Sequence, residues 1–164
     1  MDKQSLLAQM NENLRESARL ARNASEDAEH EARTGATPCE KRNDARVAIE
    51  YSQMAKAQAR RARDARESLA TLERFEPKPL GPRDRITIGA VVEIEDEETG
   101  AGRTFFLAPV GAGMNLTGPD GDGHITVVTP ASPIGRAVRG RLVGDIIDVT
   151  IKGNLREWQI TYAC

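Results

Sequence analysis

Mostly small or apolar residues recur at alternating spacings of three and four along the first 76 residues, with one extra step of four in the second of two series, which indicates paired helices. One series comprises Leu7, Met10, Leu14, Ser17, Ala21, Ala24, Ala28 and Glu31, and the other comprises Val47, Tyr51, Met54, Gln58, Ala62, Ala65, Leu69 and Leu72. Heptad-like spacing is typical of a coiled coil. Between the two series, Gly35 and Pro38 continue a helix poorly. The sequence therefore predicts an antiparallel helical hairpin over residues 1–76 that folds back near residue 39.

The outward positions of the second predicted helix are rich in cations. They are Lys56, Arg60, Arg61, Arg63 and Arg66. Such a run is usually a solvated face, and it leaves little apolar surface for the alternative in which the hairpin serves dimerisation. We therefore expect a monomer.

A proline-rich segment over residues 77–84 separates the hairpin from a part of the chain with a different period. Pro77, Pro79 and Pro82 cannot continue a helix and make a stiff connection. Beyond them, every second residue is apolar, at Ile86, Ile88, Ala90, Val92 and Ile94. This period of two predicts a half-buried strand over residues 86–95.

The remainder of the C-terminal half predicts a small β-rich domain. Further strands are expected over residues 103–110, 124–129, 146–151 and 155–162, with a glycine-rich loop over 111–123. In the last strand, Trp158, Ile160 and Tyr162 should point to one face. The predicted fold class is α+β, with a coiled-coil hairpin over residues 1–76, a linker over 77–84, and over 85–164 a five-stranded antiparallel sheet domain with one short helix.

Charge and cysteine content exclude several classes of protein. The formal net charge is −2, so the chain lacks the cationic surplus of a general nucleic-acid binder. No long apolar run predicts a membrane span or a signal peptide. Cys39 and Cys164 form no disulfide framework and fit a reducing compartment. We expect a cytoplasmic protein that does not bind membranes.

Residues 132–149 contain the signals for a capped helix, a tight turn and a strand. Ser132 is a favourable N-cap, and Pro133 suits the first helical position because its missing N–H has no helical partner there. Gly140 stands where a left-handed helix end is needed. Gly144 followed by Asp145 makes the turn into the strand that begins at residue 146.

The stretch ITVVTPASPIGRAVRG over residues 125–140, followed by Val143-Gly144-Asp145, resembles the C-terminal domain of the Gre-type (GreA/GreB) transcription elongation factors, an FKBP-like module. IGAVV at residues 88–92 and WQI at residues 158–160 support the resemblance, which covers residues 85–163. It implies a regulator that binds bacterial RNA polymerase at its secondary channel. Such a regulator contacts nucleic acid only indirectly, within the elongation complex, and is not itself an enzyme.

The resemblance implies that the C-terminal domain docks on polymerase around the short helix. The docking residues would be Ser132, Pro133, Ile134, Gly135, Arg136, Arg139 and Arg141. The alternative interpretation of the three arginines is a solvated face. Residues 129–131 look like an insertion relative to Gre sequences, within the expected docking loop.

The resemblance also implies two acidic residues at the hairpin tip, near the catalytic Mg²⁺ of polymerase. Asp44 falls at the first acidic position, but Val47, which cannot ligate a metal, falls at the second. Glu40, one helical turn before Asp44, offers a substitute. Alternatively, both acids only cap and solvate the start of the second helix. We expect no cofactor, only a transient Mg²⁺ shared with polymerase at Asp44, and weak stimulation of transcript cleavage or none.

An FKBP-like fold suggests a second function, that of a peptidyl-prolyl isomerase or chaperone. A proline-binding pocket of that kind needs a ring of aromatic side chains. The domain offers only Phe105, Phe106, Trp158 and Tyr162. We assign at least Trp158 and Tyr162 to the core, which leaves too few aromatic residues for such a pocket.

Overall fold

The computed structural model describes residues 2–34, 41–81, 83–118, 121, 123–151 and 153–164. The chain forms two compact units. The hairpin unit comprises Asn11–Ala70, and the sheet unit comprises Met1–Met10 together with Thr71–Cys164. No helix among the described residues combines the length and the apolar character needed to cross a membrane.

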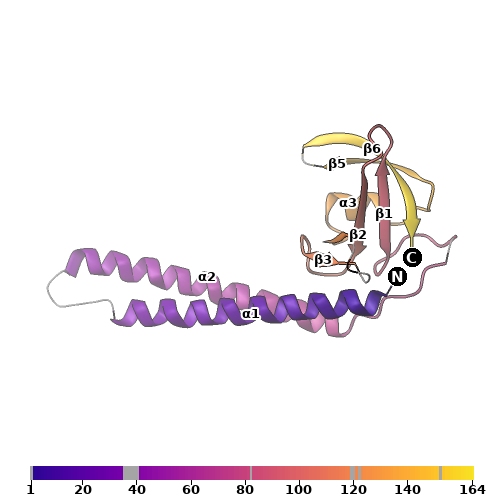
Figure 1. The fold of residues 1–164 in the computed structure, drawn as a ribbon. Coiled ribbons are helices and arrows are strands. Elements are labelled where there is room, and N and C mark those ends of the chain that lie inside the picture. The colour runs from indigo at the N-terminus through magenta and orange to yellow at the C-terminus, as the bar shows by residue number, and fades with distance from the viewer. Residues whose placement is uncertain (1, 35–40, 82, 119–120, 122, 152) are drawn as a thin grey trace. The chain divides into compact units, whose positions relative to one another are not determined.

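Two long antiparallel helices build the hairpin unit (Figure 1). Helix α1 is Lys3–Thr34 and helix α2 is Lys41–Glu73. The predicted helical hairpin is confirmed, and the helix ends at Thr34 and Lys41 bracket the predicted fold-back. Residues 35–40, which include Glu40, lie outside the described part of the chain.

The buried seam of the hairpin unit confirms the predicted one at Leu14, Ala21, Ala28, Ala62 and Ala65 and differs from it by one position elsewhere. On α1 it runs through Leu14, Ala18, Ala21, Ser25 and Ala28, and on α2 through Ala55, Ala62 and Ala65. Ser17, Glu31, Val47 and Met54 are exposed, so their assignment to the seam was wrong. On α1 the predicted and observed positions are Ser17 against Ala18 and Ala24 against Ser25, so residue type did not distinguish them, whereas on α2 the small Ala55 is buried in place of the larger Met54. At the observed seam, the buried Ser25 Oγ donates to the Ala55 carbonyl oxygen at 3.1 Å.

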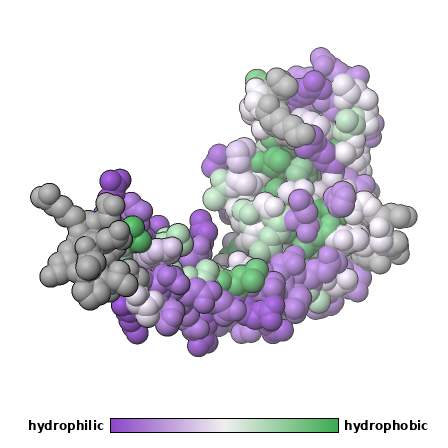
Figure 2. Space-filling view, turned by 60° about the vertical axis from the view of Figure 1, so that its left-hand side comes forward, coloured by the Kyte–Doolittle hydropathy of each residue, from purple (hydrophilic) through white to green (hydrophobic). Residues whose placement is uncertain are grey.

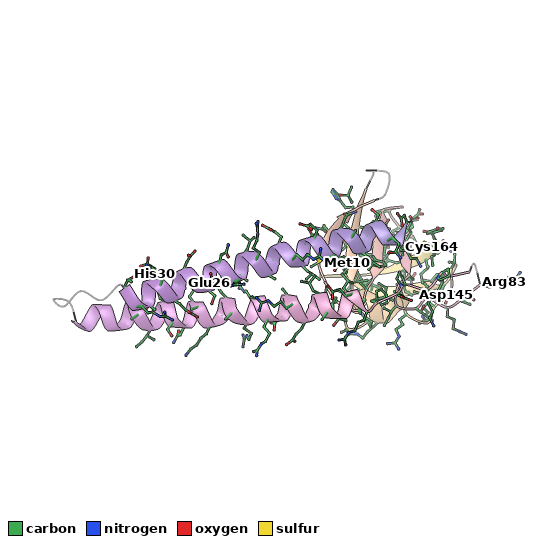
Figure 3. The ribbon with its side chains drawn as sticks, turned by 90° about the horizontal axis from the view of Figure 1, so that it is seen from below. Met10, Glu26, His30, Arg83, Asp145 and Cys164 are labelled. Atoms are coloured by element: carbon green, nitrogen blue, oxygen red, sulfur yellow. The ribbon has the colours of Figure 1, made fainter. Side chains whose placement is uncertain are left out.

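On the face that Figure 2 shows, the described residues of the hairpin unit are largely hydrophilic. The ion pairs found on it join residues of the same helix, as in Arg19–Glu16, Arg22–Glu26 and Arg46–Glu50. Glu26 is labelled in Figure 3. Pairs of this kind at spacings of three and four stabilise each helix by a few tenths of a kcal/mol.

The sheet unit holds six strands and one short helix among the described residues. The elements are β1 (Val91–Asp96), β2 (Gly102–Leu107), β3 (Asn115–Thr117), β4 (His124–Val128), α3 (Pro133–Val138), β5 (Ile146–Ile151) and β6 (Asn154–Ala163). The order across the sheet is β3-β4-β2-β1-β6-β5. The predicted α+β class with one short helix is confirmed, but β2 and β4 run parallel and a sixth strand is present, so the antiparallel, five-stranded sheet of the prediction is corrected to a mixed sheet of six strands among the described residues. The additional strand, β3, lies inside the predicted loop over residues 111–123.

The first strand starts later than its period of two predicts. Gly89 has a φ of 99°, a left-handed conformation that interrupts an extended strand. A Cβ at this position would approach both the Cα and the Cβ of Pro77 to 3.0 Å. Ile86 is nevertheless buried, and its backbone exchanges hydrogen bonds with Gly140 and Arg141 rather than with a strand of the sheet.

The main core lies on the face of the sheet against which α3 packs. Its buried members are Ile86, Ala90, Val92, Ile94, Phe105, Leu107, Val128, Val138, Ile147, Val149, Trp158, Ile160 and Ala163. Val91, Phe106 and Val127 alternate with these residues along β1, β2 and β4 and are also fully buried. Around these three residues the central strands are therefore covered on both faces, whereas Glu95 on β1 and Arg103 on β2 are exposed.

Residues at the start of α1 belong to the sheet unit and close its β3 edge. The Gln9 side-chain amide donates to the Thr117 carbonyl oxygen at 3.0 Å. It also accepts a hydrogen bond from the Thr117 backbone N–H at 2.9 Å. Gln9 thus pairs with β3 as one residue of a neighbouring strand would.

A β-bulge changes the face of one predicted core aromatic. The pairing of β1 with β6 shifts between Glu93 and Ile94, so Tyr162 lies opposite Glu93 while Ile160 lies opposite Ile94. Trp158 and Ile160 are buried as predicted, but Tyr162 is exposed. The prediction that all three share one face is therefore wrong, because the bulge turns Ala163 inward instead.

Asp96 ends β1 and holds the turn that follows it. One carboxylate oxygen accepts hydrogen bonds from the backbone N–H groups of Glu98 and Thr99 at 3.0 and 2.9 Å. The other accepts from the Arg156 guanidinium at 2.9 Å. These bonds, that from Arg156 first, lower the pKa of Asp96 from 3.8 to about 2.

We predict that Asp96→Asn lowers the free energy of unfolding at pH 7 and removes a pH dependence below pH 4. Because the carboxyl has a lower pKa in the folded state, the unfolded state binds the proton first, and this stabilisation is lost as the pH falls from about 4 to about 2. Urea unfolding at pH 7, 4 and 2.5 should show the variant and the wild type converging. The exposed Glu95→Gln should stay within about 0.5 kcal/mol of wild type at pH 7. An equal Asp96→Asn deficit at all three pH values would contradict this account.

Candidate functional site

The chain passes from β4 into α3 through a turn organised by the Thr129 carbonyl oxygen. This oxygen accepts hydrogen bonds from the Ser132 backbone N–H at 2.9 Å and from Ser132 Oγ at 2.7 Å. Ser132 Oγ in turn accepts from the Gly135 N–H at 3.0 Å. The predicted N-cap is confirmed, and Pro133 occupies the first helical position. The turn residues 129–131, predicted as an insertion, are thereby fixed against the helix.

Gly135 is buried at the closest approach of α3 to this turn. A Cβ built on Gly135 would overlap the Thr129 carbonyl oxygen and lie 2.9 Å from Ser132 Oγ. Its backbone φ is not in the left-handed region, so the requirement for glycine is one of space. Gly135 therefore shapes the candidate docking surface by allowing α3 to lie against the turn.

The other predicted docking residues divide between core and surface. Ile134 is half-buried and packs against the main core. Arg136, Arg139 and Arg141 are exposed. Arg136 donates from Nη1 to the Ala131 carbonyl oxygen at 2.6 Å, which ties it to the turn. The structure thus brings the predicted residues together around one short helix, and their role in docking remains a prediction.

Arg85 joins this group and was not anticipated from the sequence. Its Nη1 donates to the Gly140 carbonyl oxygen at 2.8 Å. Gly140 has the predicted left-handed conformation, with a φ of 79°. The contact joins residues 55 positions apart, and no local pattern indicates such a pairing.

At the other candidate site, Asp44 lies in the first turns of α2, and Glu40 lies outside the described residues. Val47 is exposed, with 43% of its surface accessible. Arg46 pairs with Glu50 at 3.3 Å. Among the described residues, no group of three or more His, Cys, Asp or Glu side chains could hold a metal ion.

The aromatic residues of the sheet unit do not gather around one cavity. Phe105 belongs to the main core, whereas Phe106 follows it on the opposite face of β2. The Trp158 ring is buried, and the Arg103 guanidinium lies 5.7 Å from its centroid. Tyr162 is exposed on the opposite face from Trp158. The four side chains therefore cannot form the ring that a proline-binding pocket requires.

The sequence pattern of a known family covers the region just described. The family described as "Transcription elongation factor, GreA/GreB, C-term" matches residues 81–163. This chain belongs to the GreA/GreB family. A search of curated protein sequences found no match.

Solved structures of GreA/GreB-related proteins align with the chain at low identity. The GreA factor homolog 1 (Gfh1) protein of Thermus thermophilus is 18% identical over 96% of this chain and 94% of its own, with a TM-score of 0.41. Gfh1 of Thermus aquaticus is 20% identical over 98% and 90%, with a TM-score of 0.39. A GreA/GreB elongation factor from Nitrosomonas europaea is 18% identical over 60% and 78%, also with a TM-score of 0.39.

For this GreA/GreB-family chain, we predict that Gly135→Ala lowers the free energy of unfolding by more than about 2 kcal/mol, because the new methyl group must displace backbone at the Thr129 carbonyl. Urea denaturation followed by Trp158 fluorescence measures the effect. Gly102→Ala is the matched control, since a Cβ there meets nothing within 4 Å, and it should stay within about 0.5 kcal/mol of wild type. Equal stabilities of the two variants would refute the steric role of Gly135.

Proposed function

We propose that this GreA/GreB-family elongation factor binds bacterial RNA polymerase through its sheet unit and places the hairpin tip in the secondary channel. The observation that supports this most directly is the family match over residues 81–163, which contains the complete turn and helix built around Thr129, Ser132 and Gly135. As a family, these proteins are modulators of polymerase and not enzymes themselves. The active site would belong to polymerase.

The docking surface in this proposal consists of Ser132, Pro133 and the arginines around α3. Arg136, Arg139 and Arg141 are exposed cations held on a well-ordered scaffold, which suits recognition of a carboxylate-bearing protein surface. The hairpin has the complementary role. Its seam of alanine and serine keeps the two helices close together, as a probe for a narrow channel requires.

The docking surface predicts a loss of binding upon charge reversal. The triple variant Arg136→Glu, Arg139→Glu, Arg141→Glu should weaken binding of the full chain to core RNA polymerase by about 100-fold or more. The three attractive contacts between arginine and carboxylate would become repulsive. Biolayer interferometry with immobilised polymerase measures this. The control, Arg74→Glu with Lys78→Glu, reverses exposed cations of the same unit outside the surface. If wild type fails to bind polymerase, the proposed function is wrong.

From the residues at the hairpin tip we predict weak stimulation of transcript cleavage, which a second carboxylate introduced beside Asp44 should strengthen. Wild type should stimulate cleavage in a backtracked elongation complex weakly or not at all, because Val47 cannot ligate Mg²⁺. Val47→Asp should raise the cleavage rate, since this exposed position accepts a charge without burying it. Ile49→Asp is the matched control, as Ile49 is also exposed, at 58%, and points about 200° around α2 from Val47.

Two further variants test the acids themselves. Asp44→Ala and Glu40→Ala should leave binding to polymerase unchanged and abolish any residual cleavage stimulation. Strong cleavage by wild type that Asp44→Ala removes would contradict the weak-cleavage assignment. It would show that a rearranged tip delivers a carboxylate despite Val47.

The alternative function, a peptidyl-prolyl isomerase, finds no support in the aromatic residues. Phe105 and Phe106 face opposite sides of the sheet, and Trp158 is buried. A proline-isomerisation assay on a short peptide should therefore show no acceleration by the full chain.

A further inference from the structure

The outer face of α2 carries three exposed cations at helical spacing, Lys56, Arg60 and Arg63. Arg60 lies about 160° around the helix from the buried Ala62, so this basic face points away from α1. The three cations line an open hollow of about 660 Å³, with small or polar neighbours at Gln53, Ala57 and Ala59. In the described part of the chain, no ion pair uses any of the three. Because like charges at spacings of three and four destabilise a helix, an external anionic surface would stabilise this one.

A second surface, of the opposite charge, is the face of the sheet that points away from the main core. Glu157 lies directly across from Asp148 in the pairing of β6 with β5. Glu95 lies across from Gln159, which is two residues along β6 from Glu157. Trp158, between these two residues of β6, points the other way and belongs to the main core. The three carboxylates of Glu95, Asp148 and Glu157 therefore share one face, the acidic face of the sheet.

The acidic face is open to solvent and repels itself. All three acidic side chains are exposed, and Ile146 on the same face is 51% exposed. The ion pairs between described residues include none of these carboxylates. Like charges directly opposite each other on neighbouring strands are destabilising, as Asp148 and Glu157 are here. A cationic partner would remove this repulsion.

The two faces match in spacing as well as in sign. From Lys56 to Arg63, the basic face follows α2 for about 10 Å, at about 1.5 Å per residue. The acidic face crosses from β5 over β6 to β1, which is two strand spacings of about 4.8 Å, or about 10 Å in all. A helix laid across these strands would set one cation over each carboxylate.

We infer that the basic face of α2 binds the acidic sheet face of a second copy of this chain. The contact is heterologous, since two different surfaces meet, and it can link copies head to tail. It goes beyond the proposed function and does not require polymerase. The charged outer positions of the hairpin leave little apolar surface for a dimer, but a contact between opposite charges needs none. Such a contact is weak and sensitive to salt, so the chain would be a monomer when dilute.

A nucleic-acid backbone fits the basic face less well than a second copy does. Affinity for phosphates depends on the number of cations that neutralise them, and this face offers only Lys56, Arg60 and Arg63. The formal net charge of −2 also disfavours the approach of a polyanion. The acidic face of the sheet, by contrast, supplies three carboxylates at the spacing of the cations.

Sedimentation velocity of the full chain tests the contact, at protein concentrations from about 10 to about 500 µM. Wild type should associate with a dissociation constant of about 100 µM near 0.05 M salt, and at least about tenfold more weakly near 0.5 M salt. Neutralising either face should weaken association at low salt at least about tenfold, in the variants Lys56→Gln, Arg60→Gln, Arg63→Gln and Glu95→Gln, Asp148→Asn, Glu157→Gln. The matched control removes three exposed cations elsewhere and should associate like wild type, in the variant Arg61→Gln, Arg74→Gln, Lys78→Gln.

Mixing the two neutralised variants tests whether the faces bind each other. One variant retains the acidic face and the other retains the basic face, so an equimolar mixture should associate at least about threefold more strongly than either variant alone. Circular dichroism and thermal unfolding of each variant should match wild type, because all the altered side chains are exposed.

Three results would overturn the inference. The first is a wild type that stays monomeric near about 500 µM at low salt, as it would if the two faces met within one copy. The second is a mixture that associates no better than its separate variants. The third is binding of wild type to a short single-stranded RNA that neutralising the basic face abolishes, without self-association. Since none of these measurements contains polymerase, failure of the proposed function would leave their outcome unchanged.

Discussion

The close contact between Gly135 and the Thr129 carbonyl oxygen fixes the position of α3 relative to the end of β4. Because no side chain intervenes, α3 lies directly against the end of the strand it leaves, and Ser132 can bond both partners at once. Val138 then enters the main core, and Ile134 and Ala137 pack against it. Of the arginines of the candidate docking surface, Arg136 lies on the exposed side of this six-residue helix, Arg139 is its C-cap, and Arg141 follows two residues later. A larger residue at Gly135 would change the position of all these groups together.

The burial of apolar side chains differs between the centre of the sheet and its β5 edge. The central strands bury residues on both faces around Val91, Phe106 and Val127, whereas the edge formed by β5 and β6 leaves Ile146, Leu155 and Tyr162 exposed. The β-bulge that turns Tyr162 outward lies in the pairing of β1 with β6. Asp96, at the end of β1, holds the following turn and accepts a hydrogen bond from Arg156 of β6. The β-bulge thus determines which apolar side chains of β6 face the core and which are exposed to solvent.

The sequence predicted where helices, turns and strands lie better than it predicted which side of each is buried. Helix-capping residues and breakers located α3 and the fold-back because Ser132, Pro133, Gly140 and the residues after Thr34 act locally. The hairpin seam was placed one position off at Ser17 and Ala24, because alanine and serine at adjacent positions carry no preference for one helix face, and was correct at Leu14, Ala21 and Ala28. The parallel pairing of β2 with β4, and the contact of Arg85 with Gly140, depend on residues far apart in the chain. Neither leaves a periodic signal. For the site, the resemblance supplied the residues around Ser132, whereas the hydrogen bond from Arg136 to the Ala131 carbonyl oxygen is seen only in the folded turn.

The alanine and serine seam of the hairpin also bears on how the rod moves. Helices that meet through such small side chains can approach to the short end of the usual interaxial range, about 8 Å, yet each contact removes little apolar surface from water. Leu14, a buried leucine of the hairpin unit, lies near one end of the seam, and beyond it the buried residues among those described are alanines and Ser25. Cohesion should therefore decline along the rod, with amide protons exchanging fastest toward Thr34 and Lys41. A hairpin built this way would be rigid near Leu14 and more flexible near Thr34 and Lys41. Its tip could then adapt to the walls of a narrow channel while the helices near Leu14 stay folded.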